Sequence, residues 1–171
     1  MILEFELYEQ DFLEFQLFAA SQSKQISKNK LRSWLLVTLM FAALAVVFYF
    51  KSGNSMAIYF GIATIAAALL YPKYLAWYYK RHFTTYVKEN YSYRFGEEVH
   101  IEIDNQTIFC KDKAGEGTIN TSEIEKVDET DNHFFVKIKS GVSLIIPKQS
   151  AHISDEIRAT FERLGVEVNN N

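Results

Sequence analysis

The sequence predicts a membrane helical hairpin of two transmembrane helices joined to a small α+β domain. Two uncharged apolar runs of 17 residues lie close together, at 34–50 and 55–71. After residue 96 the hydrophobic pattern changes to the alternation of strands, and one amphipathic helical stretch follows near the end. These observations divide the chain into residues 1–30, 31–79, 80–96 and 97–171.

The two spans of the hairpin are predicted at about 31–50 and 55–77. A helix that crosses a hydrocarbon core of about 30 Å needs roughly 20 apolar residues, with a lower limit near 17. A buried hairpin in a soluble core is the alternative, but two such runs are hard to bury in a chain of 171 residues. The loop 51–54 is too short for anything but a tight turn, so the helices are antiparallel and both chain ends lie on one side.

Charge predicts which side that is. The turn contributes only Lys51, whereas eight cations flank the open end of the hairpin: Lys24, Lys28, Lys30, Arg32, Lys73, Lys80, Arg81 and Lys88. By the positive-inside rule both termini are cytoplasmic, which makes this a multi-pass protein of the inner (cytoplasmic) membrane. The predicted membrane-interface anchors are Arg32, Trp34, Trp77, Lys80 and Arg81.

The first 30 residues are predicted to be cytoplasmic and to contain a strand and a helix. ILEFEL alternates, and we expect it to add a strand to the sheet of the C-terminal domain. Residues 9–24 are predicted to be helical, with Phe12, Phe15, Leu17 and Phe18 lying on the membrane or on the domain. This N-terminus lacks the basic region and cleavage site of a signal peptide. Residues 80–96 are predicted to be a helical continuation or a juxtamembrane linker.

Residues 97–171 are predicted to form an antiparallel meander followed by a helix. The strands are expected at 98–103, 107–112, 122–129, 133–139 and 142–147, with a turn at Gly115–Gly117. The helix is expected to begin at Ser154 as its N-cap and to end at Gly165, with Ile157, Phe161 and Leu164 forming its apolar stripe. An antiparallel sheet or partial barrel capped by one C-terminal helix is the layout of a pleckstrin-homology-like (PH-like) domain.

The order of these parts resembles the YcxB-like family of small bacterial membrane proteins over nearly the whole chain. The resemblance rests on Ile145-Ile146-Pro147-Lys148, on the acid-capped helix that follows it, and on the segment SEIEKVDETDNHFFVKI. The sequence departs from the family pattern at Ile124, where an aromatic residue is frequent, and at 149–151, where a more basic and aromatic stretch is expected. The resemblance implies a PH-like cytoplasmic domain without an assigned activity.

No pattern in the chain predicts catalysis or a cofactor. The nucleophile, metal-ligand and phosphate-loop motifs that enzymes use are absent. The single Cys110 allows no internal disulfide, and it has no metal-ligand spacing with the four histidines. His133 is expected in a loop, and the carboxylates of Asp128 and Glu129 on the solvent face. A net charge of −3 gives no reason to expect nucleic-acid binding.

Lys148 is the one candidate interaction residue, and two interpretations of it remain open. It follows Pro147 at the corner between the last strand and the helix. Near a helix N-terminus its cation could bind a lipid phosphate or a partner carboxylate. In the structural interpretation, the proline ends the strand and the lysine only keeps an exposed corner soluble. The second interpretation is favoured.

The leading functional hypothesis is a non-enzymatic membrane protein whose cytoplasmic domain is an interaction or regulatory module. Its expected partners are the lipid bilayer and an unidentified cytoplasmic or membrane protein. The alternative is a small accessory to transport or complex assembly that acts as a homo-oligomer through the hairpin. Neither span contains an ionisable residue of the kind that transporters place at mid-membrane, which favours the first hypothesis.

Overall fold

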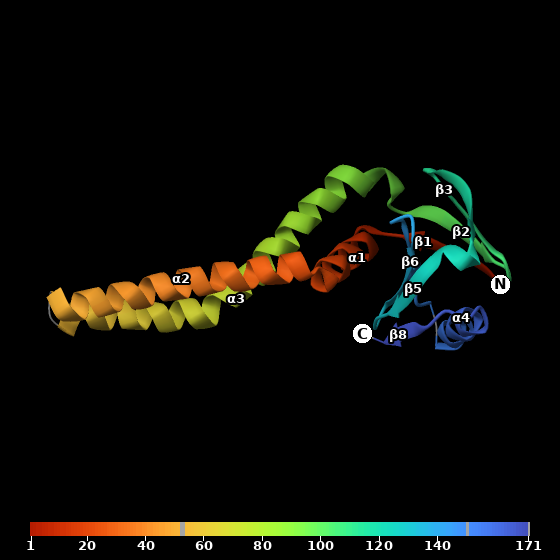
Figure 1. Ribbon diagram of the computed structural model, residues 1–171. Helices are drawn as coiled ribbons and strands as arrows, with labels where there is room; N and C mark the ends of the chain where they lie inside the picture. The colour runs from red at the N-terminus through yellow and green to blue at the C-terminus, as the bar shows by residue number, and fades with distance from the viewer. Residues whose placement is uncertain (52–53, 150, 171) are drawn as a thin grey trace. The chain divides into compact units, whose positions relative to one another are not determined.

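The computed structural model describes residues 1–51, 54–149 and 151–170 and divides the chain into two compact units (Figure 1). The sheet unit consists of Met1–Phe15 and Val87–Asn171. The hairpin unit is the segment between them, Gln16–Tyr86. The chain therefore leaves the sheet unit early, forms the hairpin unit, and returns to complete the sheet unit.

Two helices make up most of the hairpin unit. Helix α2 spans Lys24–Lys51, and helix α3 spans Asn54–Tyr91, the last residues of which belong to the sheet unit. Both are long and apolar enough to cross a membrane by length and composition. The predicted spans lie inside these helices, and residues 80–91 continue α3. The predicted turn includes Ser52 and Gly53, which lie outside the described residues.

Contacts between α2 and α3 confirm that they are antiparallel neighbours (Figure 1). Near one end of the pair, the rings of Phe48 and Phe60 stack with their centroids 5.0 Å apart. Near the other end, the hydroxyl oxygens of Ser33 and Tyr71 lie 2.6 Å apart. The C-terminal part of α2 thus contacts the N-terminal part of α3, and the N-terminal part of α2 contacts a later part of α3.

The first sheet of the sheet unit contains four strands in the order β1-β2-β3-β4. They are β1 (Ile2–Leu7), β2 (Glu97–Ile103), β3 (Thr107–Asp112) and β4 (Gly115–Asn120), and all neighbours are antiparallel. The pairing of β1 with β2 confirms that the N-terminal strand joins the sheet. The prediction of a turn at Gly115–Gly117 is wrong, because these residues begin β4. The turn lies just before them, where the Asp112 carboxylate accepts hydrogen bonds from the backbone amides of Ala114 and Gly115.

The second sheet has the order β7-β6-β5-β8. It contains β5 (Ile124–Glu129), β6 (His133–Ile138), β7 (Ser143–Pro147) and β8 (Val168–Asn170). The first three are antiparallel, as the sequence predicts, whereas β8 pairs with β5 in parallel and was not predicted. Short 3-10 helices, η1 (Ser92–Arg94) and η2 (Thr121–Glu123), lead into β2 and β5.

Helix α4 (Ala151–Arg163) buries the apolar stripe that the sequence predicts. Ile157 and Phe161 are fully buried. The end at Gly165 is also confirmed: this glycine has φ +76°, and the Val166 amide donates to the Phe161 carbonyl 3.0 Å away, which closes the last turn. The predicted N-cap is wrong, because α4 begins three residues before Ser154. Ser154 is therefore a residue of the first helical turn, and it is buried.

Helix α1 (Glu9–Gln22) begins in the sheet unit. There its aromatic side chains lie on the domain, one of the two predicted placements. The Phe12 ring stacks on Tyr91 with a centroid separation of 5.0 Å. The Phe15 ring meets Phe135 of β6 edge to face at 5.5 Å. These contacts hold the first turns of α1 against the end of α3 and against β6. They thereby position the polar side chains of α1 that lie near β6.

Candidate functional site

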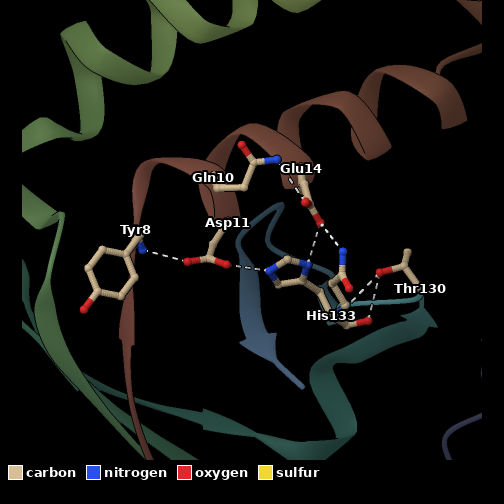
Figure 2. Close-up of polar contacts among 7 residues, drawn as sticks. Tyr8, Gln10, Asp11, Glu14, Thr130 and His133 are labelled. Carbon is tan, nitrogen blue, oxygen red and sulfur yellow. Dashed lines mark hydrogen bonds and ion pairs between the residues drawn. The ribbon is translucent and has the colours of Figure 1, made fainter. Parts of the chain in front are cut away.

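A buried histidine lies between two carboxylates of α1 (Figure 2). His133 is 3% exposed, and its Nε2 lies 2.8 Å from Asp11 Oδ1. Its Nδ1 lies 3.1 Å from Glu14 Oε2, a distance that allows a charge interaction although the geometry is not that of a hydrogen bond. The imidazole also stacks on Phe135 with ring centroids 5.4 Å apart. His133 is the first residue of β6, which confirms the predicted strand at 133–139, so the separate expectation of a loop for this residue is wrong.

This cluster positions α1 against β6. In a nucleophile–base pair one ring nitrogen of the histidine faces a hydroxyl or thiol, whereas both nitrogens of His133 face carboxylates. Asp11 also accepts a 2.7 Å hydrogen bond from the Tyr8 amide, which caps the start of α1. Burial by itself raises the pKa of the Asp11 carboxyl, but the hydrogen bonds from His133 and Tyr8 outweigh it and hold that pKa below its ordinary value.

Lys148 takes part in a second buried ion cluster. Its Nζ lies 2.7 Å from Oε1 of Glu129, whose side chain is 6% exposed. Arg158 of α4 binds both oxygens of the same carboxylate, at 2.7 and 2.9 Å. The hydrogen bonds of Arg158, with those of Lys148, hold the pKa of Glu129 below its ordinary value despite burial. The expected solvent face for Asp128 and Glu129 is therefore wrong.

The corner at Pro147 follows from the pairing of β7 with β6. The Lys148 amide donates to the Asn132 carbonyl over 2.8 Å, so the neighbouring His133–Pro147 pair is a non-hydrogen-bonded pair of the ladder. The missing N–H of Pro147 therefore leaves no gap in the sheet. The Lys148 ammonium also lies 5.2 Å from the centroid of the Phe134 ring. The Lys148 ammonium thus has a carboxylate and an aromatic ring as partners inside the sheet unit.

The predicted interface anchors all lie in the hairpin unit, and one of them has a further role. The Trp34 indole N–H donates to the Ala68 carbonyl over 3.1 Å. That carbonyl would normally accept from residue 72, which is Pro72 inside α3 and has no N–H. Trp34 therefore satisfies the acceptor that the proline frees, a requirement that is strict in an apolar environment.

The remaining anchors lie at the helix surface. Trp77 is 55% exposed, and the Arg81 guanidinium lies 5.5 Å from the centroid of its ring. Arg32 and Lys80 are also exposed. Lys30, which was not among the predicted anchors, lies 4.4 Å over the Tyr79 ring. The Arg81–Trp77 pair thus lies within α3, whereas the Lys30–Tyr79 pair links α2 to α3.

An apolar cleft with a volume of about 520 Å³ lies between the two sheets of the sheet unit. β4 and β7, the end strands of the two sheets, both line it. Ile119 and Leu144 are only half-buried there, and Val142 is 54% exposed. Arg94 and Asp112 form an ion pair at its rim. A cleft of this size and lining can accept an apolar chain.

Cys110 lines this cleft as a neutral thiol. Burial, with a smaller contribution from the Asp112 carboxylate, raises its pKa to about 11. A thiol of this kind is a poor nucleophile at neutral pH. Among the residues that the structure describes, no group of His, Cys, Asp and Glu side chains could hold a metal ion. Among the described residues, Cys110 is therefore not an activated nucleophile, and no cluster of metal ligands is found.

A family model described as YcxB-like protein matches residues 103–164. Over these residues the match confirms the resemblance that the sequence predicts. The YcxB-like match runs from the last residue of β2 to just beyond α4, so it includes the Pro147–Lys148 corner and Glu129 with both of its cations. It leaves out β1, α1 and the hairpin unit. No curated protein and no solved structure matches the chain.

The sequence did not predict either buried cluster, neither the contact of His133 with Asp11 nor that of Glu129 with Arg158. Asp11 and His133 are 122 residues apart in the chain, and Glu129 is 29 residues from Arg158. One signal was present: Asp11 stands three residues after Tyr8, at the position where a carboxylate caps a helix start. Nothing comparable marks Glu129, because the apolar residues of β5, Ile124 and Val127, do not alternate and a glutamate is usually exposed.

Proposed function

We propose that the protein is a two-span protein of the bacterial inner membrane whose cytoplasmic PH-like domain is a non-enzymatic interaction module. The observation that carries the proposal is the pairing of β1 with β2 across the hairpin unit. The Gly96 amide donates to the Leu7 carbonyl over 2.9 Å, and six residue pairs follow in register. One folded sheet thus holds both ends of the helical insertion.

This pairing supports a hairpin that crosses the membrane twice. If α2 and α3 both span the bilayer, the segments before and after them must lie on the same side for β1 and β2 to pair. A single crossing would separate the two strands by the membrane. The exposed apolar side chains of both helices, such as Leu36 at 70% and Leu69 at 66%, support insertion because water solvates such surfaces poorly.

The distribution of charge supports a cytoplasmic sheet unit. The hairpin unit carries eight lysine and arginine residues and no aspartate or glutamate. The sheet unit carries the other ten lysine and arginine residues and all 21 acidic residues, a net charge of −11. Seven of the eight hairpin cations lie outside the predicted turn. By the positive-inside rule, the helix ends that carry these seven cations face the cytoplasm.

The strand order supports the PH-like assignment. A meander β1 to β4, a meander β5 to β7 and a following helix are the parts of that layout, here with the hairpin inserted after β1. The net charge of −11 opposes binding of this domain to anionic lipid headgroups. A polypeptide partner is therefore the better ligand class. The described residues provide no catalytic set, which supports a module rather than an enzyme.

The proposal is tested by photo-crosslinking in cells. A photoreactive amino acid is placed at Val142, beside the cleft, at Glu162, an exposed residue of α4, or at Leu36, an exposed residue of the hairpin unit that serves as the matched control. The proposal expects a defined protein adduct from the sheet unit. Adducts only between copies of the chain, and only from positions in the hairpin unit, would instead support the oligomeric accessory and contradict the module.

A further inference from the structure

We infer that the free edge of β4 and the adjoining cleft bind an extended segment of a partner polypeptide that alternates apolar and basic side chains. The inference deepens the proposed function and rests on it, because it names the partner class of the interaction module. Three features carry it: the unpaired backbone edge of β4, the glycines of its inner face, and the charge of the sheet unit.

The hydrogen bonds of the β3–β4 ladder identify the free groups of β4. The Thr121 amide donates to the Gln106 carbonyl over 2.9 Å, so the flanking Thr107–Asn120 pair is non-hydrogen-bonded. By alternation, Glu116, Thr118 and Asn120 direct their N–H and C=O groups away from β3. No second neighbour of β4 is found among the described strands. Such an edge is a template for an added strand.

The inner face of β4 leaves the cleft open directly beside this edge. Gly115 and Gly117 alternate with the outward residues, so neither puts a side chain into the cleft. A Cβ at either position would meet no atom within 4 Å. An added strand would therefore place every second side chain beside Ile119 and Leu144, which are only half-buried, and apolar side chains fit there.

Charge selects the other side chains of the added strand. Glu116 lies on the outward face of β4 itself, and the outward residues of β1 and β2 include four more glutamates: Glu4, Glu6, Glu98 and Glu102. These four lie two or three strands from β4, so they act on an added strand only through the long-range negative charge of the unit. Lys111 and His100 on the same face offset only part of this charge. Basic side chains on the outer face of the partner segment would complement it. A second copy of the chain is a poor occupant, since pairing would bring two units of net charge −11 together.

The test uses the full chain in nanodiscs of zwitterionic phosphatidylcholine, to which a basic peptide binds poorly. The probe is a short fluorescein-labelled peptide that alternates lysine and valine, read by anisotropy and by amide exchange of β4. Controls are a peptide of the same composition with its lysines and valines in two blocks, and one that alternates glutamate and valine. Only the lysine–valine alternation should bind and protect the β4 amides.

Two variants separate strand addition from other modes. Thr118→Pro removes one outward N–H, and Thr118→Val keeps it; we expect the proline to weaken binding about tenfold or more and the valine less than about twofold. Gly117→Val fills the cleft at a residue with negative φ. Gly117→Val should weaken binding of the peptide and leave the unfolding midpoint of the protein unchanged. An unchanged midpoint would exclude misfolding as the cause of the weaker binding.

Equal binding by Thr118→Pro would overturn the inference, as would equal binding of the blocked peptide. A fluorescent dodecanoate that competes with the peptide and binds Thr118→Pro normally would show an acyl-chain site instead. Self-association without peptide that Thr118→Pro abolishes would show a second copy at the edge. Partner crosslinks in cells that map away from β4 would overturn the edge and leave the proposed function standing.

Discussion

Replacement of Lys148 decides between its two interpretations, because the structural one predicts a definite loss of stability. Lys148→Met removes one of the two cations that hold the buried Glu129 carboxylate, while Arg158 keeps both oxygens. A buried pair that loses its only partner costs about 3–5 kcal/mol. Since one partner remains, we expect a loss of about 1–2 kcal/mol. In a sheet unit of about 100 residues this lowers Tm by roughly 5–12 °C.

Urea-dependent pulse labelling of Cys110 measures this loss for the sheet unit alone, because that thiol is half-buried there and is the chain's only cysteine. A double-mutant cycle with Glu129→Gln should give a coupling of about 1 kcal/mol or more. The pKa of Glu129 is held below 4.5, so its ion pairs stabilise the fold above that pH, and their contribution is lost as pH falls. The difference between wild type and Lys148→Met should shrink in acid accordingly.

The structural interpretation of Lys148 fails if Lys148→Met changes the unfolding free energy by less than about 0.5 kcal/mol, the range of ordinary surface substitutions. Additivity with Glu129→Gln would contradict it as well. In either case the lysine would be free to bind a partner. The Thr118→Val variant, on an exposed edge, is the matched control and should leave the stability almost unchanged.

Three further predictions follow from the contacts. His133→Ala should destabilise the sheet unit by about 2–4 kcal/mol in urea, because it leaves two part-buried carboxylates facing each other; a loss below about 1 kcal/mol would contradict the role of the cluster. Trp34→Phe should destabilise the hairpin by about 0.5–1.5 kcal/mol in detergent unfolding. In a Pro72→Ala background the same change should cost almost nothing, because the Ala68 carbonyl regains its helical donor. Equal losses in both backgrounds would contradict the role given to Trp34. Alkylation of Cys110 should be slow at pH 8 and rise with pH towards about 11, the sign expected for a raised thiol pKa, and fast alkylation at pH 8 would contradict it.

Periodicity was sufficient for most of the fold. The alternation of ILEFEL predicted a strand of the C-terminal sheet although some 90 residues intervene, because only one face of that strand is apolar. The stripe of α4 and its glycine end were predicted for the same local reason. The prediction of a turn at Gly115–Gly117 failed because glycine occurs both in turns and in edge strands such as β4. β8 failed because VNN has no apolar alternation and its pairing with β5 is tertiary.

The polar clusters could not be predicted, since they depend on contacts between distant segments. His133 and Glu129 are residue types that are usually exposed, and their buried positions depend on contacts with α1 and α4. Trp34 was predicted as an interfacial anchor from its place at the end of a span. Its hydrogen bond to the carbonyl that Pro72 frees requires the register of two helices, which no single-sequence pattern contains.

Cysteine labelling in intact cells tests most directly the claim that one sheet on the cytoplasmic side holds both ends of a membrane hairpin. In a Cys110→Ser background, Asn54→Cys should react with an impermeant thiol reagent added outside. Asn170→Cys and Tyr8→Cys should react only after the membrane is opened. Labelling of all three from the same side would contradict the hairpin, and labelling of Tyr8→Cys and Asn170→Cys from opposite sides would contradict the pairing of β1 with β2.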